Sequence, residues 1–350
     1  MRRRLVFAIL AGVITATAFA AGASAEQPHP FAGDRTVTVM TRNLYLGTAL
    51  EPIFAAPTPF DVFAAVGAGY AQVEANRPAE RMDAIAGEIA AARPDLVAIQ
   101  EAAIFRIDVP PDGPASPAET ETYDLLALLR ASLAVRGAEY DVVAVLEGTD
   151  AEIPAGLPPA RDVRFTDRIG LLARSDAKTS DVKLGDVRTD HFTANLSLPT
   201  AVGPIRVPRG WISVDVKVRG KEFRLVATHL EAFSDVVQVA QGRELLAGPA
   251  ATDLPVVIAG DLNTRADGLG SATYGELVAA GFVDTWSGPG LTCCRAPDLS
   301  VASSHDKRVD LILARGGFRV VDTSIVDGQT ASALWRSDHA GVVATLELPR

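Results

Sequence analysis

Cysteine is scarce in this chain, and the two cysteines that it has are neighbours. Among 350 residues only Cys293 and Cys294 carry thiols. Consecutive Cα atoms lie about 3.8 Å apart across a trans peptide, whereas a relaxed disulfide needs about 4.4–6.8 Å. We therefore expect a pair of packed, partly buried thiols. The fold cannot rest on a disulfide framework and must be held by a hydrophobic core.

The chain has one long apolar segment, at its N-terminus, and no other after it. There, three arginines precede an apolar run over residues 5–21, and the small residues Ala23, Ser24 and Ala25 follow it. A basic start, a short apolar stretch and a small-x-small site are typical of a secretory signal peptide. The run is short for a membrane anchor. We expect residues 1–25 to be a signal peptide cleaved near Ala25, and the protein to be secreted, either extracellular or periplasmic.

Clusters of lysine and arginine are also absent after that N-terminus, and the formal net charge is −10. Proteins that wrap nucleic acid neutralise phosphates with basic patches, so this composition weighs against that class. It does not exclude an enzyme whose metal ion supplies local positive charge. Aromatic residues make up only 6% of the chain, and no aromatic cluster marks a membrane-inserting hairpin. No repetitive linker divides the chain, so residues 26–350 are expected to form a single domain and a monomer, with no stable protein partner implied.

Apolar, β-branched runs alternate with alanine-rich stretches that have helical spacing. Hairpins occur beside helical crossovers, which favours an α+β or mixed-sheet sandwich over a doubly wound fold. Proline-rich or inserted stretches at 51–76, 108–118 and 153–162 are expected to be surface loops. The expected helices are 78–92, 123–135 and 236–246, and the expected strands are 36–40, 96–99, 141–146, 169–173, 211–218, 221–229, 255–259, 309–313 and 342–348.

Polar residues follow several of these strands at the point where each strand ends. Asn43, Glu101, His229 and the pair Asp261 and Asn263 all stand in such positions. A buried strand delivers the side chain at its end to a fixed place, so one rim of a sheet should collect them. Carboxylates are the ligands that hard divalent cations such as Mg²⁺ prefer, and histidines can move protons near neutral pH.

The order of these motifs resembles that of the endonuclease/exonuclease/phosphatase superfamily, which has the deoxyribonuclease I-like fold. The resemblance covers residue 36 to the C-terminus. It implies an α+β fold, a four-layer α/β/β/α sandwich of two mixed sheets packed face to face. The motifs that carry it are Asn43, Ile-Gln-Glu ending at Glu101, Thr-His-Leu around His229, Gly-Asp-Leu-Asn with Asp261 and Asn263, Arg-Val-Asp-Leu-Ile-Leu with Asp310, and Ser-Asp-His with Asp338 and His339.

The resemblance also implies roles for these residues in a metal-dependent phosphodiesterase. It implies Glu101 as the principal ligand of Mg²⁺, with Asn43 beside it, Asp338 as a further carboxylate at the metal, and Mn²⁺ as an alternative ion. His339 is similar to the general base, and Asp310 to the carboxylate that orients it. The remaining matches are Asp261 and Asn263, which orient the nucleophile and the phosphate, His229, which contacts a phosphate oxygen or assists the leaving group, and Asp167, which matches an acidic residue of the nuclease branch.

The substrate stays open among several phosphate esters. Thr228-His229-Leu230 stands where the apurinic-endonuclease branch has a Tyr-x-Pro-Asn element, so the chain resembles the histidine-type branch of deoxyribonuclease I and sphingomyelinases. A phosphodiester substrate, either a phospholipid or sphingomyelin head group or a nucleic acid, fits this branch, and a phosphomonoester is an alternative. A binding protein that kept the fold and lost its activity is a hypothesis of another class. It is disfavoured because the motif positions for the ligands and base are intact.

Overall fold

The computed structural model describes residues 35–113, 115–175, 182–300 and 302–349. Residues 35–350 belong to one compact unit. The predicted signal peptide, residues 1–25, lies outside the described residues, so it stays a prediction, as does a domain beginning at residue 26. Within the described ranges no helix is both long and apolar enough to cross a membrane.

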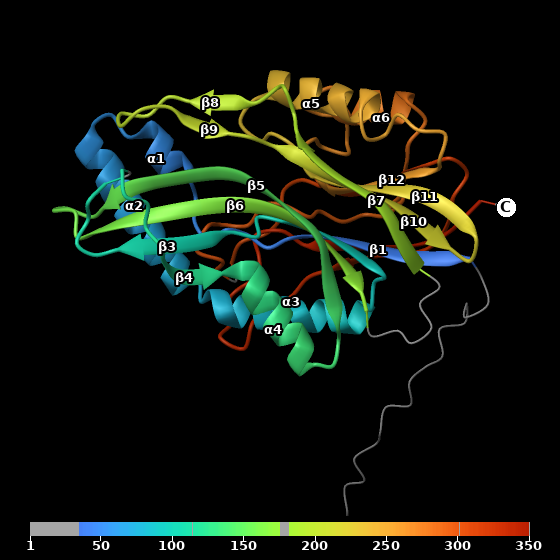
Figure 1. Cartoon of the computed structure of the whole chain (residues 1–350), viewed down its shortest axis with the longest axis horizontal. Helices are drawn as coiled ribbons and strands as arrows, with labels where there is room; N and C mark the ends of the chain where they lie inside the picture. Colours follow the sequence, from blue (N-terminus) through green and yellow to red (C-terminus); the bar gives the residue numbers. More distant parts are fainter. Residues whose placement is uncertain (1–34, 114, 176–181, 301, 350) are drawn as a thin grey trace, which may run out of the picture. The chain divides into compact units, whose positions relative to one another are not determined.

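The first sheet has eight strands in the order β15-β16-β1-β2-β6-β3-β4, with β5 also paired to β6. It is mixed: β1 and β2 run parallel, while β1 and β16 run antiparallel. Its longest strands, β5 and β6, form an extended hairpin (Figure 1). The bounds are β1 Thr36–Asn43, β2 Leu96–Gln100, β3 Ile104–Asp108, β4 Thr120–Asp124, β5 Tyr140–Ala155, β6 Arg161–Arg174, β15 Arg319–Val326 and β16 Gly341–Glu347.

The second sheet has six strands in the order β13-β14-β12-β11-β10-β7, and it too is mixed. Strands β10 and β11 form the predicted hairpin around Arg219 and Gly220, and β11 and β12 run parallel. A separate two-stranded hairpin joins β8 to β9. The bounds are β7 Val182–His191, β8 Leu196–Leu198, β9 Ile205–Val207, β10 Gly210–Val218, β11 Lys221–His229, β12 Val256–Asp261, β13 Val283–Asp284 and β14 Asp310–Arg315.

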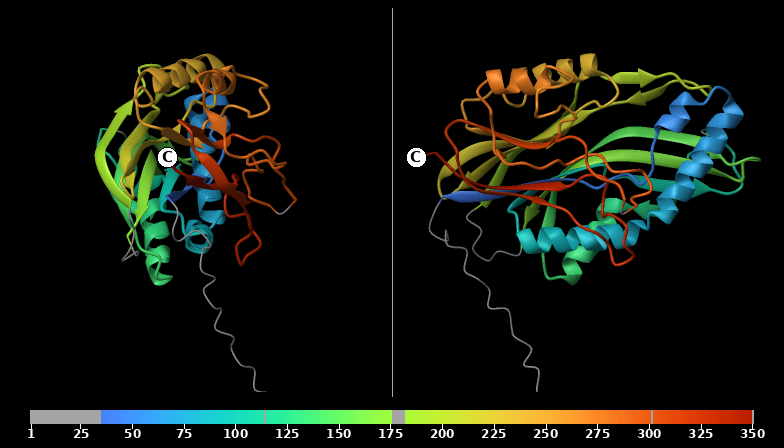
Figure 2. Two further views of the ribbon diagram at one scale, coloured as in Figure 1. Left: turned by 90° about the vertical axis from the view of Figure 1, so that its right-hand side faces the viewer. Right: turned by 180° about the vertical axis from the view of Figure 1, so that it is seen from behind.

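The two sheets pack face to face, and helices cover their outer faces. Alternate residues of β1, β2, β6 and β16 meet those of β10, β11, β12 and β14 in one buried apolar cluster. Two further clusters join the first sheet to α2, α3 and α4, and the second sheet to α5 and α6. Figures 1 and 2 show α3 and α4 on the side opposite α5 and α6. The predicted four-layer α/β/β/α sandwich is confirmed. The helices are α1 Glu51–Ala55, α2 Pro59–Ala75, α3 Pro78–Ala92, α4 Leu125–Val135, α5 Asp235–Ala247 and α6 Thr273–Ala279.

Parallel pairing brings strand ends to a common level in both sheets. In the second sheet Thr228 pairs with Gly260, and His229 pairs with Asp261. The backbones approach so closely there that a Cβ on Gly260 would overlap the carbonyl oxygen of Thr228. Glycine is therefore required at this position by contact with the neighbouring strand.

The prediction that residues 51–76 form a surface loop is wrong. This stretch contains α1 and α2, and α2 buries Val62, Val66, Tyr70 and Val73 against the first sheet. Its many small residues conceal the apolar positions at helical spacing. Similarly, the ends of the stretch 153–162 belong to β5 and β6, whereas 109–118 does connect two strands, β3 and β4.

The expectation of two unpaired cysteines is also wrong. Cys293 and Cys294 are joined as a vicinal disulfide, and the peptide bond between them is cis. The expectation rested on the short Cα separation of adjacent residues, and this bridge is present with the two Cα atoms 3.0 Å apart. The Cys294 sulfur lies 4.0 Å from Nε2 of His339.

Candidate active site

Three predicted site residues stand in one row across the second sheet. His229 ends β11, Asp261 ends β12 and Asp310 begins β14, and cross-strand pairing aligns the first with the second and the second with the third. All three side chains are almost fully buried. Adjacent strands in a sheet lie about 4.8 Å apart, so the row sets the spacing of these groups without help from loops.

The first sheet supplies Asn43 and Glu101 at the ends of two parallel strands. The Asn43 amide nitrogen donates to Glu101 Oε1 at 3.0 Å and to Asp261 Oδ2 at 3.1 Å. The backbone N–H of Leu46 donates to Glu101 Oε2 at 2.8 Å. Asn43 Oδ1 accepts from the Tyr45 N–H, so in this arrangement the amide holds two carboxylates in place. Its predicted role as a metal ligand stays a prediction.

His339 is held between carboxylates on both sides of its ring. Nδ1 lies 2.8 Å from Asp310 Oδ2, while Nε2 lies 3.7 Å from Asp261 Oδ2 and 3.9 Å from Asp338 Oδ1. Burial lowers the pKa of His339, but Asp310, Asp338 and Asp261 outweigh it and raise the pKa well above its ordinary value. An imidazole with a carboxylate at Nδ1 is oriented to exchange a proton at Nε2.

The backbone around His339 is anchored from the first sheet. Arg42 Nη1 donates to the His339 carbonyl at 2.5 Å, and Arg42 Nε pairs with Glu88 at 2.9 Å in the interior. The Ser337 hydroxyl donates to the Asn43 carbonyl at 2.9 Å and accepts from the His339 N–H at 3.1 Å. These bonds tie the Ser-Asp-His turn to the end of β1.

Asp338 completes a group of three carboxylates with Glu101 and Asp261. Burial, and then the charges of Glu101 and Asp261, raise the pKa of Asp338 to about 7, with His339 acting in the opposite direction. Crowded carboxylate oxygens of this kind suit a hard divalent cation, because the cation removes the repulsion among them. The residues present therefore fit a hard divalent cation, while Glu101 and Asp338 as its ligands, and Mg²⁺ or Mn²⁺ as the ion, stay predictions. Asp261, Asp310 and His339 also lie close enough together to hold an ion.

Asp261 lies between the two histidines. Its Oδ2 is 3.5 Å from Nε2 of His229 and 3.7 Å from Nε2 of His339, and its Oδ1 accepts from the Asn263 N–H at 3.0 Å. Burial raises the pKa of Asp261 to about 6, with Asp310 and Glu101 adding to the shift and His339 opposing it. The Asn263 amide nitrogen donates to the Leu230 carbonyl at 3.0 Å, which fixes this side chain beside β11.

An arginine that the sequence reasoning missed sets the state of His229. Arg209 Nη1 lies 2.8 Å from His229 Nδ1 and 3.1 Å from Asp167 Oδ2. A guanidinium is only a donor, so Nδ1 must accept and the ring proton must be on Nε2. Burial, Arg209 and then His339 lower the pKa of His229 well below its ordinary value. His229 is thus a neutral imidazole with an Nε2–H donor at the site, and Asp167 orients Arg209.

Two further buried arginines support the site and were not singled out from the sequence. Arg81 donates to the carbonyls of Leu44 at 2.7 Å and Tyr45 at 3.0 Å, which shapes the turn after Asn43. Arg42, described above, holds the turn of His339. For Arg42 the sequence did offer a signal, a charged residue inside the otherwise apolar strand Val-Met-Thr-Arg-Asn. A buried charge requires partners, so such a residue is expected to anchor its surroundings.

Comparisons with known proteins agree with the fold. The family model described as the endonuclease/exonuclease/phosphatase family matches residues 60–339. No curated protein sequence matches the chain. Solved structures share the fold: a protein of this family from Bacteroides thetaiotaomicron has a TM-score of 0.56 at 16% identity, covering 90% of this chain and 98% of its own.

Two other solved structures show the same likeness of fold. A humanized D. rerio TDP2 has a TM-score of 0.55 at 15% identity, with 90% of this chain and 100% of that chain covered. A mannosyl-6-phosphatase from B. thetaiotaomicron has a TM-score of 0.52 at 16% identity, with 89% and 100% covered. With the sandwich, the row of His229, Asp261 and Asp310, and the family model spanning most of the sequence, this chain belongs to the endonuclease/exonuclease/phosphatase family.

Proposed function

We propose that this chain is a secreted, Mg²⁺-dependent phosphodiesterase in which His339 is the general base. The observation that carries the proposal is the setting of His339, with Asp310 at Nδ1 and the carboxylates of Asp261 and Asp338 near Nε2. That setting matches a proton-accepting imidazole beside a cation site. Members of the family are nucleases and phosphoesterases, so hydrolysis of a phosphate ester is the reaction to consider.

The reaction that we infer is an in-line attack of water on phosphorus. Nε2 of His339 takes a proton from the water as the new P–O bond forms, and Asp310 stabilises the imidazolium. The P–O bond to the leaving group breaks on the opposite side of phosphorus, and the departing alkoxide takes a proton from solvent. The Nε2–H of His229 donates to a phosphate oxygen and stabilises the developing charge. A divalent cation held by Glu101 and Asp338 would draw charge from a non-bridging phosphate oxygen and offset the carboxylates that raise the pKa of His339.

Asp261 and Asn263 orient the reacting groups in this proposal. Asp261 is within reach of both histidine Nε2 atoms, so it can accept a hydrogen bond from water or from His229 as the reaction proceeds. Asn263 lies beside it at the end of β12 and offers amide groups to the phosphate. No covalent intermediate on the protein is needed. The histidine-type branch of the family is favoured by His229, because it occupies the position where the other branch has tyrosine.

The first experiment is a substrate panel with the purified protein and Mg²⁺. It compares methyl para-nitrophenyl phosphate, plasmid DNA, sphingomyelin, phosphatidylcholine and para-nitrophenyl phosphate. We expect hydrolysis of diesters that EDTA abolishes and Mg²⁺ restores. Turnover of para-nitrophenyl phosphate alone would contradict the phosphodiesterase and indicate a phosphomonoesterase. A complete lack of hydrolysis across the panel would support a non-catalytic binding protein.

Secretion is part of the proposal and rests on residues 1–25 alone. The basic start, the apolar run and the Ala-Ser-Ala site are its support. Expression of the full chain with sequencing of the exported protein tests it. An N-terminus near Glu26 is expected, and retention of the full chain inside the cell would contradict the signal peptide.

A further inference from the structure

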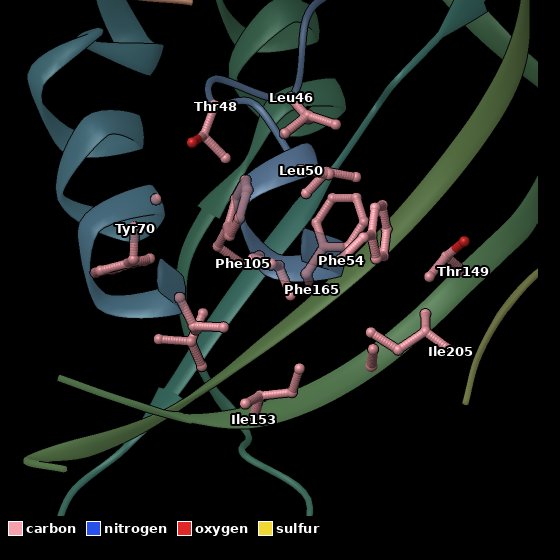
Figure 3. Close-up of a pocket in the computed structure, with 15 residues that line it drawn as sticks. Leu46, Thr48, Leu50, Phe54, Tyr70, Phe105, Thr149, Ile153, Phe165 and Ile205 are labelled. Carbon is pink, nitrogen blue, oxygen red and sulfur yellow. The ribbon is translucent and has the colours of Figure 1, made fainter. Parts of the chain in front are cut away.

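A pocket of about 70 Å³ lies where the two N-terminal helices meet the long hairpin of the first sheet. Side chains from α1, α2, β5, β6 and β9 line it. In the view of Figure 3, Leu46 and Thr48 lie at one end and Ile153 at the other, with the aromatic rings of Phe54, Phe105 and Phe165 between them. The helices that enclose it are those of the stretch 51–76, which carries none of the family motifs.

The wall of this pocket is almost entirely apolar. None of the described residues that line it is charged, and only Thr48, Tyr70 and Thr149 have polar side chains. The Thr48 hydroxyl is already engaged with Gln72 Oε1 at 3.2 Å. A polar group placed here would lose its hydration without gaining hydrogen bonds, which costs free energy. An apolar cavity of this kind remains dry and accepts hydrocarbon groups.

One residue that lines the pocket also contacts the candidate metal ligand. The backbone N–H of Leu46 donates to Glu101 Oε2 at 2.8 Å, while the Leu46 side chain lines the pocket. A single residue therefore separates the hydrocarbon wall from the carboxylate that would hold the cation beside the phosphate. Phe105, another wall residue, follows Glu101 by four positions along the chain.

The pocket also reaches the part of the chain that follows His229. Phe54 of α1 lines the pocket and packs edge to face against Phe233, with ring centroids 5.5 Å apart. Phe233 lies four residues after His229, and its ring is partly exposed. The lining residues Leu46 and Phe54 therefore contact Glu101 and Phe233, respectively.

We propose that this pocket binds the alkyl group of the substrate, so that the preferred substrate is a phosphate diester with an aliphatic chain. The proposal rests on the proposed function, because it takes the phosphate to lie at Glu101, His229 and His339. The sugar and base of a nucleotide carry polar groups for which this wall offers few partners, so nucleic acid is the disfavoured alternative.

Binding of alkylphosphonates, which cannot be hydrolysed as esters, tests the pocket apart from turnover. Methylphosphonate, butylphosphonate and hexylphosphonate would be titrated calorimetrically into the protein with Mg²⁺. Each methylene buried contributes roughly 0.8 kcal/mol, or about fourfold in Kd, so Kd should fall by at least about tenfold from methyl to butyl. A negative heat-capacity change that grows with chain length would accompany it.

Substitutions at Val66 test whether the dependence of Kd on chain length arises in this pocket. Val66 lines the pocket from α2, and Val62 is buried in the same helix without lining it. Val66→Phe should reduce the ratio of hexyl to methyl affinity, and Val66→Ala should raise it. The matched control Val62→Ala removes the same atoms from the same helix and should leave the ratio unchanged. If Val66→Phe fails to fold, Val66→Ala and its control still give different expectations, a raised ratio and an unchanged one.

The outcomes separate this inference from the proposed function. Equal affinity for all three phosphonates, or a chain-length effect that Val66→Ala leaves at the wild-type value, would overturn the alkyl pocket even if methyl para-nitrophenyl phosphate is hydrolysed. Hexanol binding as tightly as hexylphosphonate would also overturn it, because the pocket would then not be joined to the phosphate. A clear chain-length effect without any hydrolysis would keep the pocket and contradict the phosphodiesterase.

Discussion

At the scale of single residues, His339 is the group on which the proposed chemistry depends most. His339→Ala should lower the turnover of methyl para-nitrophenyl phosphate by about 10²–10⁴-fold, with little change in substrate affinity, because general-base catalysis is lost. Asp310→Asn should act in the same direction more weakly, since the ring remains but its orienting charge is gone. Steady-state kinetics with the exposed His191→Ala as a control measure this. If His339→Ala keeps the wild-type turnover and the same acidic limb of the rate–pH profile, another group takes the proton from water.

Arg209 is a positioning residue for His229, and its loss should disturb the tautomer of the ring. In the wild type, long-range proton–nitrogen NMR should show His229 protonated at Nε2 only, because Arg209 occupies Nδ1. Arg209→Leu should abolish that preference and lower turnover by roughly 10–100-fold, the usual effect of losing an orienting partner. The control Arg206→Leu removes an exposed arginine from β9 and should change neither signal nor rate. An unchanged His229 tautomer in Arg209→Leu would show that Arg209 does not set the tautomer.

The pH dependence of stability follows from the neutral state of His229. Its pKa in the folded protein lies well below the ordinary 6.5, so below pH 6.5 the unfolded chain binds a proton that the folded chain does not. Stability from this group is therefore lost as pH falls below 6.5, by up to about 1.4 kcal/mol per pH unit. The contribution of His229 is the difference in pH dependence between wild type and His229→Gln, measured by denaturant unfolding between about pH 7 and pH 5. Asp261 and Asp338, whose pKa values are raised, contribute with the opposite sign, but they are present in both proteins. A constant difference between the two proteins over this range would contradict a neutral buried His229.

At the scale of the elements, the close approach of β11 and β12 can be tested at Gly260. Gly260→Ala should reduce the free energy of unfolding by roughly 1–3 kcal/mol, because the added methyl collides with the Thr228 carbonyl. It should also lower activity, since His229 and Asp261 are the next residues along these strands. Gly275→Ala is the matched control in α6, where a Cβ meets nothing within 4 Å and should stabilise the helix. Equal stability of the two variants would mean that the strands can separate at no cost.

Much of the element pattern was predictable from periodicity, and each failure has a physical cause. The helix over 78–92 and the hairpin around Arg219 and Gly220 have clear apolar spacing, and both are confirmed. Helix α2 was missed because its many small residues conceal the apolar spacing, and one of them, Gly67, packs so closely that a Cβ there would lie 2.7 Å from the backbone nitrogen of Gly156. The edge strand β7 is almost wholly exposed, so no buried face left a pattern to detect.

Five predicted site residues could be found because they follow buried strands: Asn43, Glu101, His229, Asp261 and Asn263. Asp310, Asp338 and His339 were found from the family motifs, and the structure brings them to the same place. What sequence reasoning could not provide is the partner of each group. Arg209 lies 20 residues from His229 and reaches it only through the β10–β11 hairpin. The alkyl pocket was also beyond reach, since ordinary core residues such as Val66 line it and only the tertiary fold leaves a space among them.

At the scale of the whole molecule, a divalent cation should stabilise the folded protein. A ligand that binds only the folded state at 100 times its Kd adds about 2.7 kcal/mol, so Mg²⁺ or Mn²⁺ should raise the midpoint of thermal unfolding. Glu101→Gln should greatly weaken that rise, because a neutral amide replaces a charged ligand. Differential scanning calorimetry with and without EDTA measures it, and Glu121→Gln on the exposed edge of β4 is the control. An equal rise in Glu101→Gln would place the ion elsewhere.

The face-to-face packing of the two sheets has a consequence for how this molecule is made. Glu101 and Asn43 come from the first sheet, His229, Asp261 and Asp310 from the second, and His339 from a turn anchored to the first. Neither half of the sandwich contains a cation site together with a proton acceptor and its orienting carboxylate. Under the proposed function, a nascent or partly assembled chain would therefore be hydrolytically silent, and the capacity to cut a phosphate ester would arise only when the interior between the halves has closed.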